Sequence, residues 1–185
     1  MAKISPIGRV SYPRVFRPEA YNDQDPKYSI VLIWPKDGTD LSQLKEDISE
    51  AIRKKWGDKP PRGLKIPVRD GDVEREGKPE FEGCWFATFS AKADEGHAAP
   101  TVVGPDKQPI SEASQRFYPG CWARVMYSCY AYDTSGNRGV GLGLQHVQKC
   151  HDDEPFVAIS SADEFDAVEQ KVEGIDDLIS SDLPF

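Results

Sequence analysis

Apolar residues in this chain fall in short runs separated by turn-forming residues, which is the pattern of β-strands. Residues 28–34 are almost continuously apolar and too few for an ordinary helix, so they predict a strand buried on both faces. Residues 8–16 are rich in β-branched and aromatic side chains and predict a bent strand, because Pro13 cannot donate a backbone hydrogen bond. Three more strands are predicted at residues 84–91, 122–132 and 139–148, the last two joined by a hairpin loop at 133–138.

The apolar spacing changes to that of a helix between Asp40 and Trp56. Asp40 and Gln43 are spaced as a capping box at the start, and three cations at residues 53–55 favour the end of the helix. Gly57 then closes it. The pattern therefore predicts one main helix, placed directly after the second strand.

Five strands, one helix and no βαβ alternation predict a mainly β fold, a small five-stranded antiparallel barrel with long loops. Residues 60–83 are polar and rich in Pro and Gly, so we expect a long, partly ordered connection there. We expect one domain over residues 1–150, followed by an acidic, largely disordered tail over residues 151–185.

Charge is divided unevenly between these two parts. The 185 residues carry a net charge of -8. Residues 1–150 hold 22 Lys and Arg against 20 Asp and Glu, whereas residues 151–185 hold 1 against 11. A slightly basic body is thus followed by an acidic segment, which is typical of interaction tails.

Location follows from what the chain lacks. No apolar run approaches the roughly 20 residues that span a bilayer, and residues 1–9 do not read as a secretory signal. We therefore expect a cytoplasmic protein with no membrane partner, whose four cysteines are reduced.

Enzymatic chemistry has one candidate, the carboxylates Asp70, Asp72 and Glu74, which could hold a divalent cation in a metal-dependent nuclease. No His or Lys stands beside them in the sequence to activate water, and Asp-Gly is a common turn, so we interpret the cluster as a turn. The cysteines are too widely spread for a structural zinc site. The sequence therefore predicts a protein that is not an enzyme, with no cofactor and no metal.

Aromatic residues interleaved with cations form the strongest chemical pattern. Single-strand binders use this mixture, because bases stack on aromatic faces while Lys and Arg follow the phosphates. Along residues 122–132 the alternation places Trp122, Arg124, Tyr130 and Tyr132 on the more exposed face, and Trp34, Phe86 and Tyr127 are expected in the core. The candidate DNA-binding residues are Tyr12, Arg14, Phe16, Arg17, Lys27, Trp85, Phe89, Lys92, Arg116, Phe117, Tyr118, Trp122, Arg124, Tyr130, Tyr132 and Arg138.

The last residues add a more specific motif, an acidic stretch followed by Leu183, Pro184 and Phe185. This ending resembles the carboxy-terminal tip of bacterial single-stranded DNA-binding protein. The resemblance implies that Asp182, Leu183, Pro184 and Phe185 bind proteins of replication or recombination.

The body is also similar to a family of bacteriophage single-stranded DNA-binding proteins with an OB-fold. The motifs that carry this resemblance are residues 8–16, 27–29, 70–72, 117–120 and 139–148. It implies sequence-independent binding of single-stranded DNA in phage replication, recombination and repair, in the cytoplasm of the host. A helix after the second strand departs from the common OB arrangement, so we expect a modified OB-fold. A nuclease and a structural virion protein are the alternatives, and self-association stays open.

Overall fold

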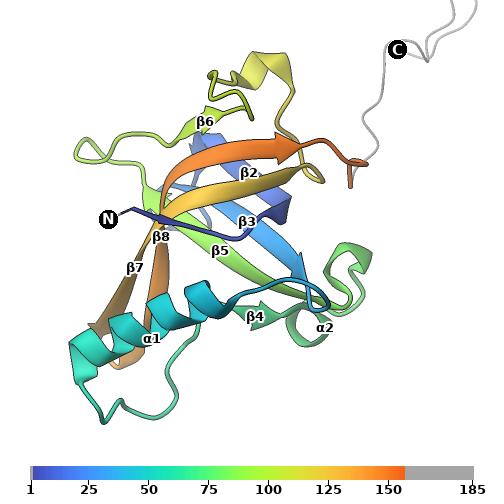
Figure 1. The fold of residues 1–185 in the computed structure, drawn as a ribbon. Coiled ribbons are helices and arrows are strands. Elements are labelled where there is room, and N and C mark those ends of the chain that lie inside the picture. The colour runs from blue at the N-terminus through green and yellow to red at the C-terminus, as the bar shows by residue number, and fades with distance from the viewer. Residues whose placement is uncertain (1, 157–185) are drawn as a thin grey trace, which may run out of the picture.

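The computed structural model describes residues 2–156, in which five long strands carry the fold (Figure 1). These strands are β2 (Gly8–Glu19), β3 (Lys27–Pro35), β5 (Cys84–Lys92), β7 (Trp122–Thr134) and β8 (Asn137–His151). Three short strands are β1 (Lys3–Ile4), β4 (Arg69–Asp70) and β6 (Thr101–Val103). The helical elements are α1 (Ser42–Trp56), α2 (Gly71–Glu74) and the 3-10 turns η1 (Pro79–Phe81) and η2 (Glu112–Ser114).

The five long strands form a closed ring in the order β7, β2, β3, β5 and β8, with β8 pairing again with β7. Four of the joins are antiparallel, and the join between β5 and β8 is parallel, through the single pair Ser90 and Gly143. An odd number of strands cannot alternate in direction around a ring, so at least one join has to be parallel. The predicted five-stranded barrel with one main helix is confirmed, with this one difference.

The hairpin between β7 and β8 is tighter than predicted. The ladder continues to the pair Thr134 and Asn137, which leaves only Ser135 and Gly136 in the turn. Both have positive φ, 51° and 82°, as a two-residue turn between twisted strands requires. The expected loop at 133–138 is therefore mostly strand.

Strand β3 is buried on both faces, as its apolar run predicts. Ile30, Leu32 and Trp34 face the barrel interior. Val31 and Ile33 face the opposite side, where they pack with Phe81 and Phe86. This second cluster is covered by the segment between α1 and β5.

That covering segment was expected to be a partly ordered connection, and the prediction is wrong over residues 69–81. It forms β4, α2 and η1, and it buries the ring of Phe81 completely. Asp70 caps α2 by accepting a hydrogen bond from the backbone N–H of Asp72 at 3.0 Å. The Asp-Gly pair therefore begins a short helix, where a turn was expected.

Helix α1 lies across one end of the barrel, with Leu44 and Ile48 buried in the core (Figure 1). It begins at Ser42, so Asp40 stands just outside it and accepts hydrogen bonds from the N–H and the hydroxyl of Ser42, at 2.9 and 2.6 Å. Gln43 instead donates to Asp47. The predicted capping box is therefore absent, because the helix starts too late for Asp40 to be its cap.

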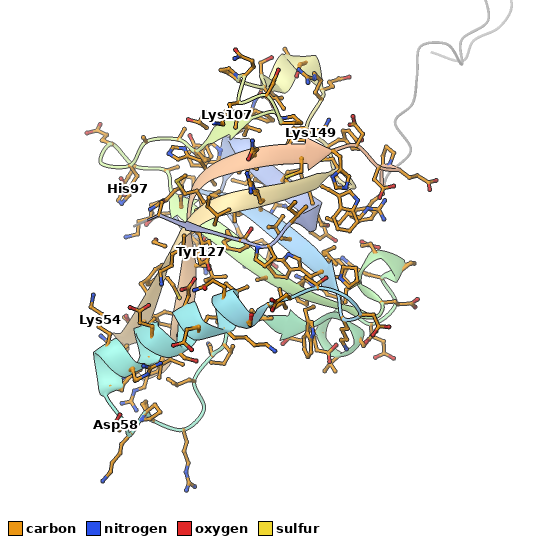
Figure 2. The ribbon with its side chains drawn as sticks, in the orientation of Figure 1. Lys54, Asp58, His97, Lys107, Tyr127 and Lys149 are labelled. Carbon is orange, nitrogen blue, oxygen red and sulfur yellow. The ribbon has the colours of Figure 1, made fainter. Side chains whose placement is uncertain are left out.

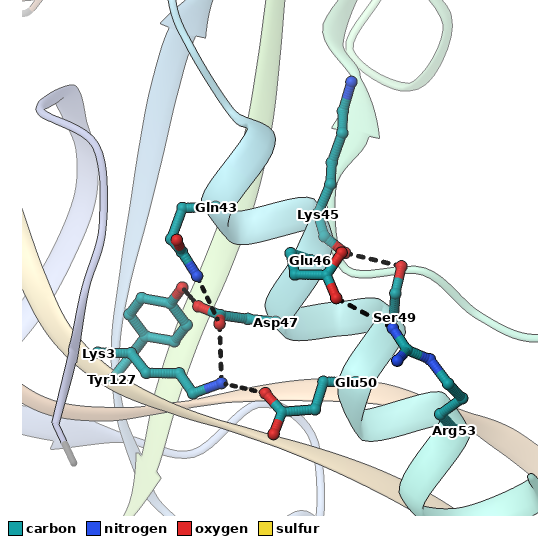
Figure 3. Close-up of polar contacts among 9 residues, drawn as sticks. All are labelled: Lys3, Gln43, Lys45, Glu46, Asp47, Ser49, Glu50, Arg53 and Tyr127. Carbon is teal, nitrogen blue, oxygen red and sulfur yellow. Dashed lines mark hydrogen bonds and ion pairs between the residues drawn. The ribbon is translucent and has the colours of Figure 1, made fainter.

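Asp47 ties α1 to the barrel (Figure 3). Its side chain is 4% exposed and accepts hydrogen bonds from Lys3 Nζ at 2.8 Å, Gln43 Nε2 at 3.1 Å and Tyr127 Oη at 2.5 Å. Burial alone would raise the pKa of Asp47, but these donors together lower it below its usual value. Burial, and then the hydrogen bond to Asp47, raise the pKa of Tyr127. Asp47 is thus an ionised carboxylate that joins β1, α1 and β7.

Candidate nucleic-acid interface

Three adjoining hollows run along the outer side of β3 and β5 and up to the β7–β8 hairpin. Their volumes are about 390, 260 and 250 Å³, and Ser90 lines all three. We call this surface the β3–β5 groove. Its polar and aromatic lining comprises Arg14, Glu19, Tyr21, Gln24, Asp25, Lys27, Ser29, Arg69, Arg75, Thr88, Ser90, Lys92, His97, Ser128, Tyr130, Tyr132 and Gln145.

Tyr130 stands between the two hollows next to the hairpin, and its side chain is 48% exposed. It pairs across the ladder with Gly141, and Tyr132 pairs with Gly139. A β-carbon at Gly141 would lie 2.5 Å from the Tyr130 ring, and one at Gly139 would lie 2.8 Å from the Tyr132 hydroxyl. The alternating glycines of β8 therefore leave room for these two tyrosines to lie over the strand, as two aromatic platforms in the groove.

Lys27 and Lys92 are directly opposite each other on β3 and β5. Like charges in that position repel each other, at a cost of about 0.2–1 kcal/mol. Among residues 2–156, no carboxylate lies within 4.0 Å of either ammonium group. Such a pair is suited to a phosphate, which would offset the repulsion by lying between the two cations.

Arg75 lies at the hairpin end of the groove and was missed by the sequence analysis. Its guanidinium carbon is 5.7 Å from the centre of the Phe81 ring and 5.4 Å from that of Phe86. Its Nε is the one buried side-chain nitrogen or oxygen of the described chain without a hydrogen-bond partner. An unpaired buried donor costs about 1–3 kcal/mol, so Arg75 is held there at a cost to stability. The sequence clue was an Arg near two Phe residues, in a segment that we considered only for its carboxylates.

Arg14 is the third predicted cation in the groove, and it forms an ion pair with Glu19. Tyr12 precedes it in a β-bulge, with φ of 45°, and is 39% exposed. Lys78 donates a hydrogen bond to the Tyr12 hydroxyl and lies 5.1 Å from the centre of its ring. Five predicted residues thus line the groove. Tyr12 does not line it but lies on β2, two residues before Arg14. The five are Arg14, Lys27, Lys92, Tyr130 and Tyr132.

Tyr118 and Trp122 have a different position, beneath residues 152–156, which we call the strap. Tyr118 Oη donates to Asp152 at 2.8 Å, and Trp122 Nε1 donates to Asp153 at 2.7 Å. The hydrogen bond from Lys149, followed by that from Tyr118, lowers the pKa of Asp152. The polar atoms of both aromatic residues therefore hold the strap on the barrel.

Arg9 completes the attachment of the strap. It donates to the carbonyl of Glu154, and its guanidinium lies 4.3 Å from the centre of the Phe156 ring. The region expected to be a tail from residue 151 thus begins with a packed segment. The predicted partner-binding residues 182–185 lie outside the described part of the chain.

Three of the predicted aromatic residues belong to the core or its margin. Phe89 is fully buried, and Phe117 is 7% exposed. Phe16 packs edge-on against Phe117, with ring centres 6.3 Å apart. Phe89 and Phe117 are among the candidate DNA-binding residues, and their burial leaves no free ring face for a base in this structure. Trp34, Phe86 and Tyr127 are buried, as expected.

The remaining predicted residues lie elsewhere on the surface. Arg17 and Arg138 form ion pairs with Glu112 and Asp133. Arg124 donates to Gln148, and Arg116 is exposed near Lys149, which donates to its carbonyl. Trp85 lies under Lys36, against the core and away from the groove. Five predicted residues thus lie outside the groove: Arg17, Trp85, Arg116, Arg124 and Arg138.

Each of the candidate nuclease carboxylates forms an ion pair within the protein, and Asp70 and Asp72 form a clasp on either side of Lys36. Its ammonium group lies 2.7 Å from both Asp70 and Asp72, and Asp72 also accepts from the N–H of Gly83 at 2.8 Å. The hydrogen bond from Lys36, followed by that from Gly83, lowers the pKa of Asp72. Glu74 pairs with Arg69 at 2.9 Å. Within residues 2–156, no group of three or more His, Cys, Asp and Glu side chains is arranged to hold a metal ion.

Comparison with known proteins gives a consistent result. Residues 3–177 match the family described as the single-stranded DNA-binding protein of Enterobacter phage Enc34. No curated protein matches the chain by sequence. No helix of the described chain is long and apolar enough to cross a membrane.

Solved structures of phage proteins resemble this fold. The single-stranded DNA-binding protein from bacteriophage Enc34 in complex with ssDNA is 28% identical, with a TM-score of 0.68 over 83% of this chain and 87% of that chain. Another structure of that protein is 26% identical, with a TM-score of 0.63 over 88% and 84%. The single-stranded DNA-binding protein gp2.5 of bacteriophage T7 is 17% identical and shares the fold, with a TM-score of 0.62 over 94% and 99%.

Proposed function

Because the chain belongs to the family of the single-stranded DNA-binding protein of Enterobacter phage Enc34, we propose that it binds single-stranded DNA along the β3–β5 groove. The observation that supports this assignment most strongly is that exposed aromatic rings and cationic side chains lie together in that groove. Tyr130 and Tyr132 lie over the glycines of β8, between the cations Lys27 and Lys92 at one end and Arg75 at the other.

Binding in this groove is independent of base sequence. Each base stacked on a tyrosine contributes about 1–3 kcal/mol, and any base offers the face that stacking needs. Lys27, Lys92 and Arg75 neutralise phosphates, which carry no sequence information. Ser29, Thr88 and Ser90 add hydroxyl groups that donate to phosphate oxygens.

The protein acts by binding, without catalysis. Lys36 lies between the carboxylates of Asp70 and Asp72, in the place that a divalent cation would need. This clasp supports a structural role for the carboxylates, because it fixes α2 and, with it, the segment that carries Arg75.

The biological role that fits this activity is protection of single-stranded DNA during phage replication, recombination and repair in the host cytoplasm. The barrel is the DNA-binding domain, and residues 157–185, with their excess of acidic residues, form a recruiting segment. Asp182, Leu183, Pro184 and Phe185 bind replication or recombination proteins, with the apolar residues as the contact and the acidic residues as the steering charge.

The test is a titration of labelled single-stranded and duplex oligonucleotides of one sequence, at two salt concentrations and without metal. We expect preference for the single strand, and weaker binding at higher salt. Tyr130→Ala should lower the affinity, whereas Trp122→Ala, the same truncation of an aromatic residue outside the groove, should not, because Trp122 holds the strap. Equal affinity for single-stranded and duplex DNA would refute the proposed function. An equal loss of affinity in both variants would show that the binding surface includes the strap.

A further inference from the structure

A strongly basic segment leads away from the groove and has no role in the function described so far. Residues 53–65, which we call the basic arm, contain six cations and the single carboxylate Asp58. They comprise the last turn of α1 and the loop that follows it. All six cationic side chains are exposed: Arg53, Lys54, Lys55, Lys59, Arg62 and Lys65.

Intramolecular contacts do not explain this charge. Of the six cations, only Arg53 has an ion-pair partner among residues 2–156, Glu46 at 3.0 Å. Cations in the last turn of a helix are stabilised by the helix dipole, which accounts for residues 53–55. Lys59, Arg62 and Lys65 lie beyond the helix and gain nothing from it. Their charge is therefore available to a ligand.

The loop end of the basic arm touches the hairpin that carries the tyrosine platforms. Lys65 N–H donates to the carbonyl of Arg138 at 3.0 Å, and the N–H of Val140 donates to the carbonyl of Lys65 at 3.0 Å. A β-carbon at Gly139 would lie 2.5 Å from the Lys65 carbonyl oxygen and 2.8 Å from the Tyr132 hydroxyl. Lys65 and Tyr132 therefore meet at one residue of β8, where the groove ends.

We infer that the basic arm binds the phosphates of single-stranded DNA that leaves the β3–β5 groove beside Tyr132. The inference rests on the proposed function and extends it, since the bound strand then covers more of the protein than the groove. The arm supplies mostly charge, with Trp56 as its only aromatic residue. Its contribution is consequently sensitive to salt and appears only for strands long enough to reach it.

The chain itself offers a second polyanion, the segment 157–185 with its excess of acidic residues. Bound DNA is favoured as the occupant, because the arm continues a surface that already combines aromatic platforms with unpaired cations. The two occupants predict opposite results. Removing arm charge weakens DNA binding if DNA is the ligand, and strengthens it if the acidic segment is.

The experiment compares the full-length protein with the double variant Lys59→Gln/Arg62→Gln. Both positions lie in an exposed loop, and thermal unfolding verifies the fold. The matched control Lys45→Gln/Lys107→Gln removes the same charge from exposed positions outside the groove. Figure 2 shows Lys54 and Asp58 at the end of α1 and Lys107 at the other end of the molecule, beside β6. Affinity for oligo-dT of about 5 and about 16 nucleotides, the range that one OB-fold covers, is measured against salt.

We expect the arm variant to bind the short oligonucleotide like the wild type, and the long one more weakly. For the long strand, the plot of log affinity against log salt should become less steep by about 1.4. Each phosphate contact of a single strand contributes about 0.7 to this steepness, and the variant removes two such contacts. The control should leave both slopes unchanged. An equal loss at both lengths, no loss at all, or a gain in affinity would each overturn the inference. If the wild type binds neither oligonucleotide, the proposed function itself fails.

Discussion

Tyr127 donates a hydrogen bond of 2.5 Å to Asp47, a residue 80 positions away in the sequence, and this bond fastens β7 to α1 (Figure 3). Both residues are buried, and the same carboxylate also receives Lys3 from β1. Three elements are therefore held by one charged group at the end of the barrel. The bond is remote from the groove, so its energetic role can be measured separately from DNA binding.

Tyr127→Phe keeps the ring in the core and removes only the hydroxyl. We expect the free energy of unfolding to fall by about 1.5–3 kcal/mol, as for a hydrogen bond to a charged group. Denaturant titration measures the loss, and DNA affinity should be unchanged. A change below about 0.5 kcal/mol would mean that Lys3 and Gln43 alone satisfy Asp47.

The lowered pKa of Asp47 makes stability depend on acid. A carboxylate whose folded pKa is depressed stabilises the protein above its unfolded pKa, about 3.9, and this contribution is lost as pH falls through the folded pKa. We expect the difference in unfolding free energy between wild type and Asp47→Asn to be largest near pH 6 and to shrink below about pH 4. A difference that is constant from pH 7 to pH 2 would show that ionisation of Asp47 plays no part.

Lys27 and Lys92 should affect binding and stability in opposite directions. Lys27→Gln or Lys92→Gln should reduce the salt slope of DNA binding by about 0.7. Lys92→Gln also relieves the repulsion between the two cations, so the free energy of unfolding should rise by about 0.2–1 kcal/mol, whereas Lys27→Gln additionally removes the cation opposite Glu19 on β2 and should raise it less. Fluorescence anisotropy and denaturant titration measure the two effects. Loss of stability in both variants would contradict the assignment of this pair as an anion site.

Gly141→Ala tests whether the Tyr130 platform depends on the glycine beneath it. The added methyl group would meet the Tyr130 ring at 2.5 Å, so the ring has to move. We expect DNA affinity to fall toward that of Tyr130→Ala, by at most the value of one stacked base, about 1–3 kcal/mol. The double variant Tyr130→Ala/Gly141→Ala should bind DNA no more weakly than Tyr130→Ala alone, because the ring that the methyl group would displace is already absent. Gly96→Ala, whose methyl group has no neighbour closer than 3.5 Å, is the control.

The acidic terminal segment should compete with DNA for the cations of the groove. Deletion of residues 174–185 should raise DNA affinity most at low salt, where screening is weak. Phe185→Ala removes no charge and should leave DNA affinity unchanged while it weakens the binding of a replication protein. A deletion that lowers DNA affinity would show that the segment is part of the DNA-binding surface.

The strands and the main helix were predictable because their patterns are local. The alternation along β7 also placed Tyr130 and Tyr132 on the more exposed face, where Tyr130 is exposed and Tyr132 half-buried. The same alternation placed Trp122 with them, and it could not show that the strap, which follows 30 residues later, covers Trp122. Phe89 lies on β5 between β3 and β8, so its burial depends on how the ring closes. Arg75 depends on two Phe rings that only the folded segment brings to it. Periodicity shows which residues share a face, whereas long-range packing decides which face stays open.

The parallel join between β5 and β8 rests on one pair, Ser90 and Gly143, and the next shortest join of the ring, between β2 and β7, rests on two. It is the seam of the barrel, and Ser90 also lines all three hollows of the groove. A DNA strand bound in the groove as proposed therefore lies across this seam, because residues of both β5 and β8 line the same hollow. A ligand that binds only the folded barrel stabilises it, so DNA bound across this join is expected to raise the free energy of unfolding, and to raise it most when the groove is fully occupied.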